Sequence, residues 1–543
     1  MAVTESSAEE AHGPAGAVPE GILRRQSARE SSARTYARAL PIVPVRARGL
    51  TIEGADGRRY LDCLSGAGTL ALGHNHPVVL EAVRQVLDSG APLSVLDLAT
   101  PVKDAFITEL FQTLPPGLAG RARVQFCGPA GTDAVEAALK LVRAATGRPG
   151  FLAFTGAYHG MTAGALAVSG GAPEVQVARL PYPQDYRCPF GVGGPHGAEL
   201  AARWTESLLD DPKSGVPLPA GMILEPVQGE GGVLPAPDDW LRRMRRLTAD
   251  RSIPLIADEI QTGVGRTGAF WAVDHSGITP DVMVLSKAIG GSLPLAVIVY
   301  RDDLDLWQPG AHAGTFRGNQ LAMAAGTATL AFVRENGLAE RAGRLGARMT
   351  GQLRADLGGL ACVGEVRGRG LMIGVEMVRP ERAGPVGGRP GARGPEAAAD
   401  GRPAGRGAGV GRPGEGPAGD RPDAASPLGG MPAGPGPGAA RTAGGSAADD
   451  ARRVPPGPDP APVPRPAAPE LARAVQRECL RRGLIVELGG RHSSVVRLLP
   501  PLTISDEQAA AVVDRLTDAV GAVAREDGTR GPHAARGHDQ DPL

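Results

Sequence analysis

The stretch VMVLSKAIGGSLPLAVIV, residues 282–299, is apolar at both ends and contains Ser286, Lys287 and two glycines near its middle. Apolar runs of this length that are broken by glycine predict two buried strands flanking a tight connection. Lys287 then lies where the first strand ends. A lysine at a strand end usually buries its stem and keeps its amine in water, so this position alone does not indicate chemistry.

Lysine is rare in the rest of the chain. Of the 58 basic residues only four are lysines, at positions 103, 140, 213 and 287, and the others are arginines. An arginine keeps its proton in a protein, whereas a lysine amine can lose it, and only the neutral amine attacks a carbonyl group. Lys287, in a buried turn flanked by glycines, is therefore a candidate for covalent chemistry.

The bulk properties limit the class of protein. A chain of 543 residues can form two or more full-sized domains. The formal net charge is zero and no basic stripe is present, so we expect neither nucleic acid nor a membrane as a partner and favour a small neutral or zwitterionic ligand. The five cysteines form no CxxC pair, which argues against a zinc site or a disulfide framework. The first residues have no apolar core of signal-peptide type and no run approaches 18 apolar residues, so we expect a cytoplasmic protein.

Three segments are predicted to be disordered: residues 1–25, 380–468 and 526–543. The middle one, called the insert below, consists mainly of Pro, Gly, Ala and Arg. Such a composition cannot bury enough apolar surface to offset the entropy lost on ordering. The insert divides the ordered sequence, but a stable domain can carry it because loop-closure entropy grows only slowly with length.

The middle third of the chain alternates strand and helix patterns. Residues 221–227 and 253–260 read as strands, and residues 237–251 place Trp240, Leu241, Met244 and Leu247 on one helical face. Strands that are nearly all apolar predict an α/β fold with a parallel sheet covered on both faces. Ligands of such sheets bind at the carboxyl ends of the strands, where Glu225, Asp258 and Lys287 fall.

A glycine-rich turn leads into an amphipathic pattern in GPAGTDAVEAALKLVRAATG, residues 128–147. The amides of Gly131 and Thr132 at the start of the expected helix, with the Thr132 hydroxyl, form an anion site suited to a phosphate. The alternative is an ordinary Thr or Asp cap of the helix. Both interpretations stay open on this segment alone.

Two other motifs suggest different chemistry. ADEIQTGVGRTG, residues 257–268, contains GxGxxG, which is typical of dinucleotide sites only where a helix opens at the glycines. The following AFWAVDHSGITP does not favour such a helix. His74 and His76 suggest a metal, but no acid or thiol cluster accompanies them, so we predict a structural turn and no metal. Asp258, at a strand end, is a carboxylate that can pair with a cationic ring nitrogen.

A phosphate cradle, the aromatic YHG at 158–160, a strand-end Asp and a strand-end Lys together match the needs of pyridoxal 5'-phosphate. Here the chain resembles class III pyridoxal-phosphate aminotransferases of the ornithine and 4-aminobutyrate type, over residues 34–379 and 469–524. It is most similar to those of the diaminobutyrate:2-oxoglutarate type. This resemblance rests on the following motifs: SGAGTLALGHNHP, GPAGTDAVEAALKL, FTGAYHGMTAGALAVSG, LSKAIGG, GTFRGNQLA, RRGLIVELGG and VVRLLPPLTI.

The resemblance implies a fold-type-I enzyme. The large domain, residues 81–332, would have a mainly parallel sheet covered by helices. A small α+β domain would come from both chain ends, residues 26–80, 333–379 and 469–525. Family members usually join the last two of these segments by a short connection, and here the insert intervenes.

The resemblance also implies roles for nine residues. Lys287 would bind the cofactor covalently and transfer the proton during catalysis. Asp258, the second catalytic residue, would pair with the ring nitrogen. Tyr158 would stack on the cofactor ring, Gln261 would lie near the ring hydroxyl, and Gly131 and Thr132 would bind the phosphate. Thr315 would reach the phosphate bound in the neighbouring subunit, which implies a homodimer with shared active sites. Arg497 would bind the carboxylate of the 2-oxo acid, and Glu230 would pair with Arg497 when another substrate is bound.

The implied reaction transfers an amino group between L-glutamate and L-aspartate 4-semialdehyde, giving L-2,4-diaminobutyrate and 2-oxoglutarate. The small-molecule partners are thus an amino acid and a 2-oxo acid. Other readings remain: another ω-amino acid or polyamine aminotransferase, an aminomutase, a nicotinamide dehydrogenase built on GVGRTG, or a binding protein that acts through the insert.

Overall fold

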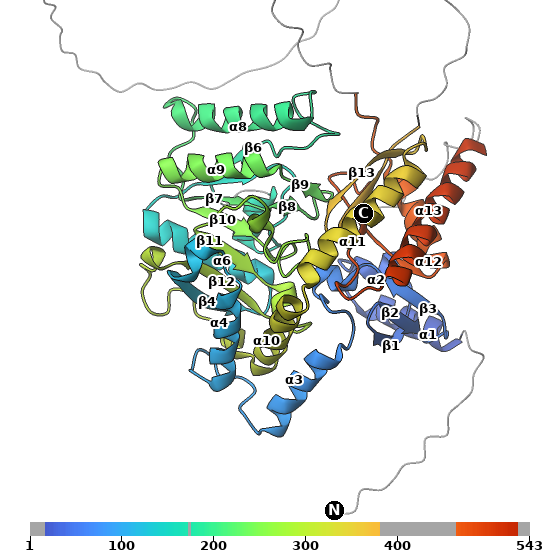
Figure 1. Ribbon diagram of the computed structural model, residues 1–543, viewed down its shortest axis with the longest axis horizontal. Helices are drawn as coiled ribbons and strands as arrows, with labels where there is room; N and C mark the ends of the chain where they lie inside the picture. The colour runs from blue at the N-terminus through green and yellow to red at the C-terminus, as the bar shows by residue number, and fades with distance from the viewer. Residues whose placement is uncertain (1–16, 172–174, 381–462, 530–543) are drawn as a thin grey trace, which may run out of the picture. The chain divides into compact units, whose positions relative to one another are not determined.

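A seven-stranded sheet forms the centre of the larger part of the molecule (Figure 1). The computed structural model describes residues 17–171, 175–380 and 463–529, and all structural statements concern these residues. The strand order is β4-β12-β11-β10-β7-β5-β6, and β12 runs antiparallel to both of its neighbours while the other pairs are parallel. The strands are β4 (Ala122–Gly128), β5 (Phe151–Phe154), β6 (Val177–Leu180), β7 (Gly221–Leu224), β10 (Leu255–Asp258), β11 (Val282–Leu285) and β12 (Ala296–Arg301).

Both faces of this sheet are covered, as the predicted all-apolar strands require. Alternate residues along β10 face different hydrophobic clusters: Leu255 and Ala257 pack with Trp240 and Leu241, whereas Ile256 packs with Val135 and Leu139. The helices on the two faces are therefore α9 (Asp238–Asp250), which is the helix predicted at 237–251, and α6 (Gly131–Thr146). The other helices of this part are α3 (Pro77–Asp88), α4 (Pro101–Gln112), α5 (Pro116–Ala119), α7 (Ala163–Ser169), α8 (Gly194–Asp210) and α10 (Gln320–Glu335).

Two four-stranded sheets make up the smaller part, and each joins segments that are far apart in the sequence. The first has the order β1-β2-β3-β15, with β15 parallel to β3. The second, β13-β14-β17-β16, is antiparallel throughout. The strands are β1 (Pro44–Arg48), β2 (Thr51–Gly54), β3 (Arg59–Asp62), β13 (Val363–Arg369), β14 (Met372–Met377), β15 (Leu484–Ile485), β16 (Glu487–Gly489) and β17 (Val495–Leu498). The predicted fold class, a large α/β domain plus a small domain from both chain ends, is confirmed.

Helix α13 (Asp506–Thr529) packs against α11 (Leu338–Leu357) and α12 (Pro469–Arg481), and the three helices contact strands of these two sheets. The remaining elements are short or lie at the start of the chain: α1 (Ala17–Arg29), α2 (Tyr36–Ala39), the β8 (Val227–Gln228) and β9 (Leu234–Pro235) pair, and five 3-10 turns, η1 (Ser65–Gly68), η2 (Ala272–His275), η3 (Lys287–Gly290), η4 (Asp302–Leu304) and η5 (Thr315–Gly318). Among the helices described, none combines the length and the hydropathy needed to cross a bilayer.

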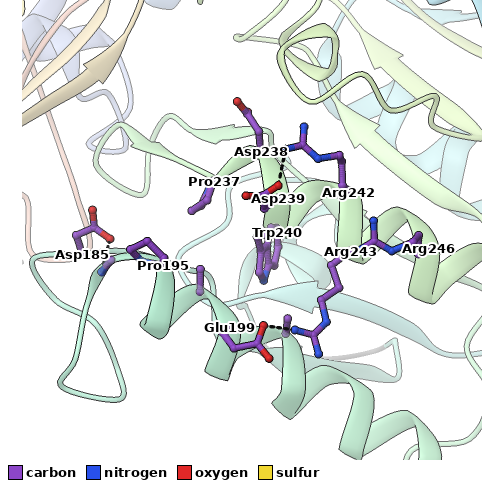
Figure 2. Close-up of a pocket in the computed structure, with 13 residues that line it drawn as sticks. Asp185, Pro195, Glu199, Pro237, Asp238, Asp239, Trp240, Arg242, Arg243 and Arg246 are labelled. Atoms are coloured by element: carbon purple, nitrogen blue, oxygen red, sulfur yellow. Dashed lines mark hydrogen bonds and ion pairs between the residues drawn. The ribbon is translucent and has the colours of Figure 1, made fainter. Parts of the chain in front are cut away.

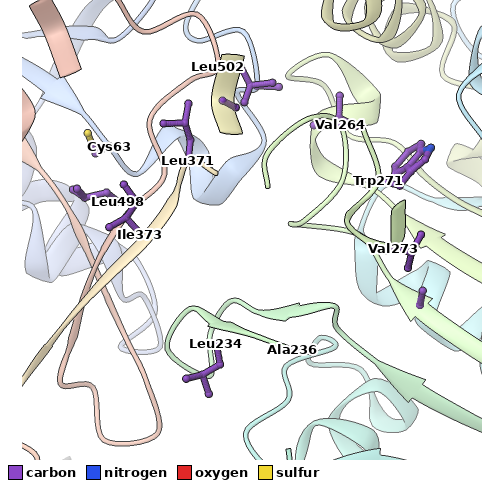
Figure 3. Packing of buried hydrophobic residues seen from close by; sticks show 14 of the residues in the cluster. Cys63, Leu234, Ala236, Val264, Trp271, Val273, Leu371, Ile373, Leu498 and Leu502 are labelled. Atoms are coloured by element: carbon purple, nitrogen blue, oxygen red, sulfur yellow. The ribbon is translucent and has the colours of Figure 1, made fainter. Parts of the chain in front are cut away.

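One hydrophobic cluster connects the two parts (Figure 3). Leu371 and Ile373 from the β13–β14 side belong to the same cluster as Val264, Trp271 and Val273, which follow β10. Apolar burial stabilises by about 25 cal/mol per Å² of surface removed from water. The large and small parts therefore share a core, which fixes residues of β16 and β17 relative to the ends of β10 and β11.

The structure differs from the predicted disordered segments at their edges. Helix α1 begins at Ala17, and α13 continues to Thr529. Residues 463–468 lie beside β14: the Arg379 amide donates to the Pro466 carbonyl at 2.9 Å, and Val378 forms a bridge with Ala467. The rest of the predicted disordered segments lies outside the described residues, and the predicted domain boundaries stay predictions.

Candidate active site

A cavity of about 290 Å³ lies where β10 and β11 end and where α6 begins. Seven of the nine residues implied by the sequence line it: Gly131, Thr132, Tyr158, Glu230, Asp258, Gln261 and Lys287. They come from positions up to 156 residues apart between Gly131 and Lys287, so the fold brings the predicted site together. Arg497 and Thr315 are not among the lining residues.

Lys287 follows β11 by two residues and opens the η3 turn. Its φ of 51° places a non-glycine residue in the left-handed region, which costs of order 1 kcal/mol and occurs most often where the surroundings enforce it. The turn is anchored because the Ser286 hydroxyl donates to the Leu295 carbonyl at 2.8 Å. Burial lowers the pKa of the Lys287 amine, while Glu230 and Asp258 oppose that shift. Burial thus favours the neutral, nucleophilic amine.

Asp258 is buried at the end of β10 and makes two hydrogen bonds. Its Oδ2 lies 2.7 Å from His159 Nδ1, and its Oδ1 accepts from the Ile260 amide at 3.0 Å. Both side chains are almost fully buried. His159 therefore positions the carboxylate, a role that sequence reasoning missed although the residue stands in the YHG motif.

Glu225 is a second buried carboxylate on the cavity wall. Its two oxygens accept from the Tyr158 amide at 2.9 Å and from the Gly229 amide at 3.0 Å. Burial raises its pKa to about 7, and the neighbouring Asp258 also raises it while His159 lowers it. Glu225 therefore ties the loop of Tyr158 to the loop that carries Glu230, and the sequence signalled it only by its place after β7.

The N-terminus of α6 forms a cradle beside the cavity. A Cβ at Gly131 would lie 2.7 Å from Ile260 Cδ1, and a Cβ at Gly160, whose φ is +122°, would lie 2.5 Å from Thr132 Oγ1. Thr132 Oγ1 is 2.7 Å from Thr162 Oγ1, so a hydroxyl pair stands next to the free amides of the helix start. This is the geometry of an anion site, and the two glycines keep it open.

Gln261 has an unfilled hydrogen-bond acceptor at the cavity. Its Nε2 donates to the Ala67 carbonyl at 3.0 Å, whereas its Oε1 is buried with no hydrogen-bond partner among the described residues. An unpaired buried polar atom costs about 1–3 kcal/mol. A ligand hydroxyl placed there would satisfy Oε1, as the predicted contact with the cofactor's ring hydroxyl requires.

Arg497 lies just behind Glu230 and is fully buried on β17. Its Nη2 is 2.6 Å from Glu230 Oε1 and 2.7 Å from Glu487 Oε2. The predicted pair of Arg497 and Glu230 is thus present in the structure. Glu487 and its partner Tyr36, whose hydroxyl donates to Glu487 Oε1 at 2.7 Å, were not predicted.

Thr315 lies in η5, away from the cavity, and is exposed. The adjacent Phe316 is 68% exposed. A contact of Thr315 with the cofactor of a neighbouring subunit therefore stays a prediction.

The GxGxxG motif does not open a helix. Gly265 and Gly268 have φ of +86° and +100°, and the next element is the 3-10 turn η2 four residues later. A dinucleotide fingerprint needs an α-helix at this point, so the dehydrogenase reading fails. His74 Nε2 lies 2.8 Å from Asp62 Oδ2, and the ring of His76 packs edge-on against Phe332.

A larger cavity of about 730 Å³ lies between α8 and α9 and shares no residue with the Lys287 cavity (Figure 2). Its charged side chains are largely paired with each other: Arg242 with Asp239, and Arg243 with Glu199. It holds no candidate nucleophile, so the chemistry lies at Lys287.

The chain is similar to known proteins over most of its length. The family described as "Aminotransferase class-III" matches residues 32–405. The chain is 48% identical over 508 residues to the diaminobutyrate--2-oxoglutarate aminotransferase of Rhizobium meliloti (strain 1021), covering 92% of this chain and 91% of that protein. It is 49% identical over 367 residues to the enzyme of the same name from Haemophilus influenzae, covering 66% and 80%. An amine transaminase from an uncultivated Pseudomonas species, solved in its PLP-bound form, is 26% identical with a TM-score of 0.69, covering 91% of this chain and 97% of that one.

Proposed function

The chain belongs to the class III aminotransferases, and we propose that it transfers the amino group of L-glutamate to L-aspartate 4-semialdehyde, giving 2-oxoglutarate and L-2,4-diaminobutyrate. The names of the two relatives support this choice of substrates. The observation that carries it is the Arg497–Glu230 ion pair at the wall of the Lys287 cavity. In the glutamate half-reaction a substrate carboxylate would bind at Arg497, and in the diaminobutyrate half-reaction none would. Arg497 therefore needs a carboxylate partner from the protein that can leave and return, and Glu230 can serve as that partner.

The proposed cofactor is pyridoxal 5'-phosphate, as the family membership implies. The cavity fits this group: an anion cradle at Gly131 and Thr132, a buried carboxylate at Asp258, the unfilled acceptor of Gln261 and a buried amine at Lys287. When bound, the cofactor supplies the electron sink that makes a C–H bond beside the reacting nitrogen acidic.

The protein's own groups then bind, orient and move protons. Asp258, held by His159, would keep a ring nitrogen protonated, because a buried carboxylate favours a cationic partner. Tyr158, which is 43% exposed and lines the cavity, offers an aromatic face to the ring. Lys287 Nζ would bind the cofactor and later carry the proton to and from the substrate carbon, a step that contributes about 100- to 10,000-fold in rate.

Arg497 and Glu230 would handle the two substrates in turn. The α-carboxylate of glutamate would bind the guanidinium of Arg497, and the Glu230 carboxylate would move away from it. Its side chain is 35% exposed, whereas that of Arg497 is 1% exposed, so Glu230 has room to move and Arg497 does not. With diaminobutyrate, which reacts at its far amine, Glu230 would stay on Arg497.

The proposal includes a homodimer with shared active sites, in which Thr315 would reach the neighbouring subunit's phosphate, and a cytoplasmic location. In this dimer Phe316, which is 68% exposed beside Thr315, would be covered by the neighbouring subunit. Phe316→Asp should shift the holoenzyme from dimer towards monomer in sedimentation velocity and lower activity at low protein concentration. If Phe316→Asp leaves sedimentation and activity unchanged, η5 does not lie in the dimer interface.

Product analysis tests the reaction. Incubation of the holoenzyme with glutamate and aspartate 4-semialdehyde should yield 2-oxoglutarate and diaminobutyrate in equal amounts. In the reverse direction diaminobutyrate should have a higher kcat/KM than ornithine or 4-aminobutyrate. Faster turnover of either of these two would favour the alternative of another ω-amino acid aminotransferase, and isomerisation without 2-oxoglutarate would favour an aminomutase.

A further inference from the structure

The Thr132 side chain connects the start of α6 with the loop that carries Tyr158. Its Oγ1 is 2.7 Å from Thr162 Oγ1 and accepts from the Thr162 amide at 3.2 Å. The residues just before Thr162, at positions 158–161, line the Lys287 cavity. Thr132 therefore stands beside the cradle in the first turn of α6 and contacts the cavity loop through Thr162.

A carboxylate fixes the direction of these hydrogen bonds. Glu136 lies one turn further along α6, and its Oε1 accepts from the Thr162 hydroxyl at 2.7 Å. The same oxygen accepts from two amides near the start of α7, at 2.8 and 3.2 Å. A carboxylate accepts hydrogen bonds and does not donate them. The single hydroxyl proton of Thr162 therefore points at Glu136.

The position of the Thr132 hydroxyl proton follows from this direction. Thr162 Oγ1 has no second proton, so in the 2.7 Å contact between the two hydroxyls Thr132 donates and Thr162 accepts. Thr132 Oγ1 accepts from the Thr162 amide at the same time. The Thr132 hydroxyl thus has no proton left for a ligand in the cradle. Thr132, Thr162 and Glu136 are called the hydroxyl chain below.

The cradle keeps its main-chain donors. Gly131 and Thr132 are the first two residues of α6 after the N-cap residue Ala130, and amides at these positions have no acceptor within a helix. Such amides and the positive end of the helix dipole bind a phosphate well. A phosphate can therefore be held here without the side chain of Thr132.

The hydroxyl chain also holds the loop that faces the cavity. The Tyr158 amide donates to Glu225 at 2.9 Å, and the His159 amide donates to the Ser169 hydroxyl at 2.7 Å. Both acceptors lie outside α6. The hydroxyl chain adds a connection from this loop to the helix that forms the cradle.

We propose that Thr162 and Glu136 are positioning residues of the cofactor site. They turn the Thr132 hydroxyl away from the phosphate, which main-chain amides hold, and use it to fasten the loop of Tyr158 and His159 to α6. This inference rests on the proposed function, since it places pyridoxal 5'-phosphate in the cavity. It links the part of the site that would bind the phosphate to the part that would face the ring.

Pyridoxal, which lacks the phosphate, distinguishes the two possible roles of the Thr132 hydroxyl. In the full chain freed of cofactor, Thr132→Val should bind pyridoxal and pyridoxal 5'-phosphate about 2- to 10-fold more weakly, because a hydrogen bond that holds the loop is lost. The ratio of the two dissociation constants, measured by equilibrium dialysis, should stay within about twofold of wild type. A hydroxyl that binds the phosphate would weaken the binding of pyridoxal 5'-phosphate alone, and that result would overturn the inference.

Variants at Thr162 test the hydroxyl chain from its other side. Thr162→Val should weaken pyridoxal binding by about the same factor as Thr132→Val, and the double variant should bind no more weakly than either, because each removes the same connection. Thr162→Ser keeps the hydroxyl and should restore the wild-type affinity. As a control, Thr146→Val removes a hydroxyl at the other end of α6, which donates to the Val142 carbonyl, and should change neither dissociation constant. Wild-type pyridoxal affinity in both Thr132→Val and Thr162→Val would contradict the proposed fastening of the loop.

Hydrogen exchange makes the test independent of the cofactor. A wild-type protein that binds neither compound would refute the proposed cofactor and with it the proposed function. Peptides that cover residues 157–166 should still exchange faster in Thr162→Val than in Thr146→Val, because the loop has lost its connection to α6. Equal exchange in the two variants would show that the hydroxyl chain does not hold the loop.

Discussion

Replacing Arg497 by alanine should damage the two half-reactions to different extents. Glutamate and 2-oxoglutarate would lose the guanidinium that binds their α-carboxylate. Diaminobutyrate presents no carboxylate at that place during its own half-reaction, so it would lose only the indirect effect of Arg497 on Glu230. We expect the glutamate half-reaction to slow at least about tenfold more than the diaminobutyrate half-reaction.

The structure sets the size of this difference. Arg497 is fully buried, so its contact with a carboxylate is not screened by water and belongs to the charge-assisted class worth roughly 1.5 to 3 kcal/mol. At 1.4 kcal/mol per factor of ten, this is about 10- to 150-fold. Glu230 is more exposed, so its contact with Arg497 contributes less, about 1 kcal/mol. Glu230→Ala should therefore slow the diaminobutyrate half-reaction about fivefold and spare the glutamate half-reaction.

Single-turnover absorbance of the holoenzyme measures each half-reaction separately. Arg497→Lys serves as the matched variant, because it keeps the charge and loses the planar fork; its glutamate half-reaction should fall between wild type and Arg497→Ala. Thermal unfolding of each variant controls for damage to the fold, since Arg497 is buried between β14 and β16. Equal losses in the two half-reactions of a folded Arg497→Ala enzyme would refute the exchange of partners.

Three other predictions follow from the site and the fold. Lys287→Arg should abolish the borohydride-trapped cofactor adduct and reduce turnover at least 100-fold. As a control, Lys213→Arg at an exposed position should leave turnover unchanged. Normal turnover of Lys287→Arg would exclude Lys287 as the cofactor lysine. Replacing residues 381–462 by a short Gly/Ser linker should leave activity within about twofold. It should raise the free energy of unfolding by about 2 kcal/mol, because a shorter loop costs less closure entropy and the Arg379 amide and the Pro466 carbonyl that it joins are already 2.9 Å apart. A linker variant that fails to fold or to turn over would contradict this prediction. Burial raises the pKa of Glu259 to about 7, so the folded state is penalised as pH rises from about 4.5 to above 7. Relative to Glu259→Gln, the wild type should lose about 3 kcal/mol of unfolding free energy over that range, and a pH-independent difference in urea titrations would show the assignment to be mistaken.

Local sequence carried the prediction of most of the site. Asp258 ends an apolar strand, Lys287 follows one by two residues, and Gly131 and Thr132 begin a helix. Their neighbours in the chain therefore place them at the carboxyl edge of a parallel sheet. The resemblance then identified Glu230 and Arg497, which no local pattern distinguishes from ordinary charges.

The contacts that were missed join distant segments. His159 meets Asp258 across 99 residues, and Tyr36 meets Glu487 across 451. Glu487 faces Arg497 only because of the register between the short strands β16 and β17, and a shift of one residue would point it to the other side. The helical start at Ala17 and the pairing of residues 466–467 with β14 were missed because composition describes an average over a segment and not its edges.

The position of Arg497 in the last sheet to be completed matters during synthesis. Lys287 and the strands around it leave the ribosome about 210 residues before Arg497, which at 5–20 residues per second is roughly 10–40 s. Residues 381–462 account for about 4–16 s of that interval. A nascent chain can thus form β10 and β11 before the guanidinium of Arg497 is available to pair with Glu230. In the proposed function, the step that depends on Arg497 would therefore become possible only after most of the polypeptide has been made.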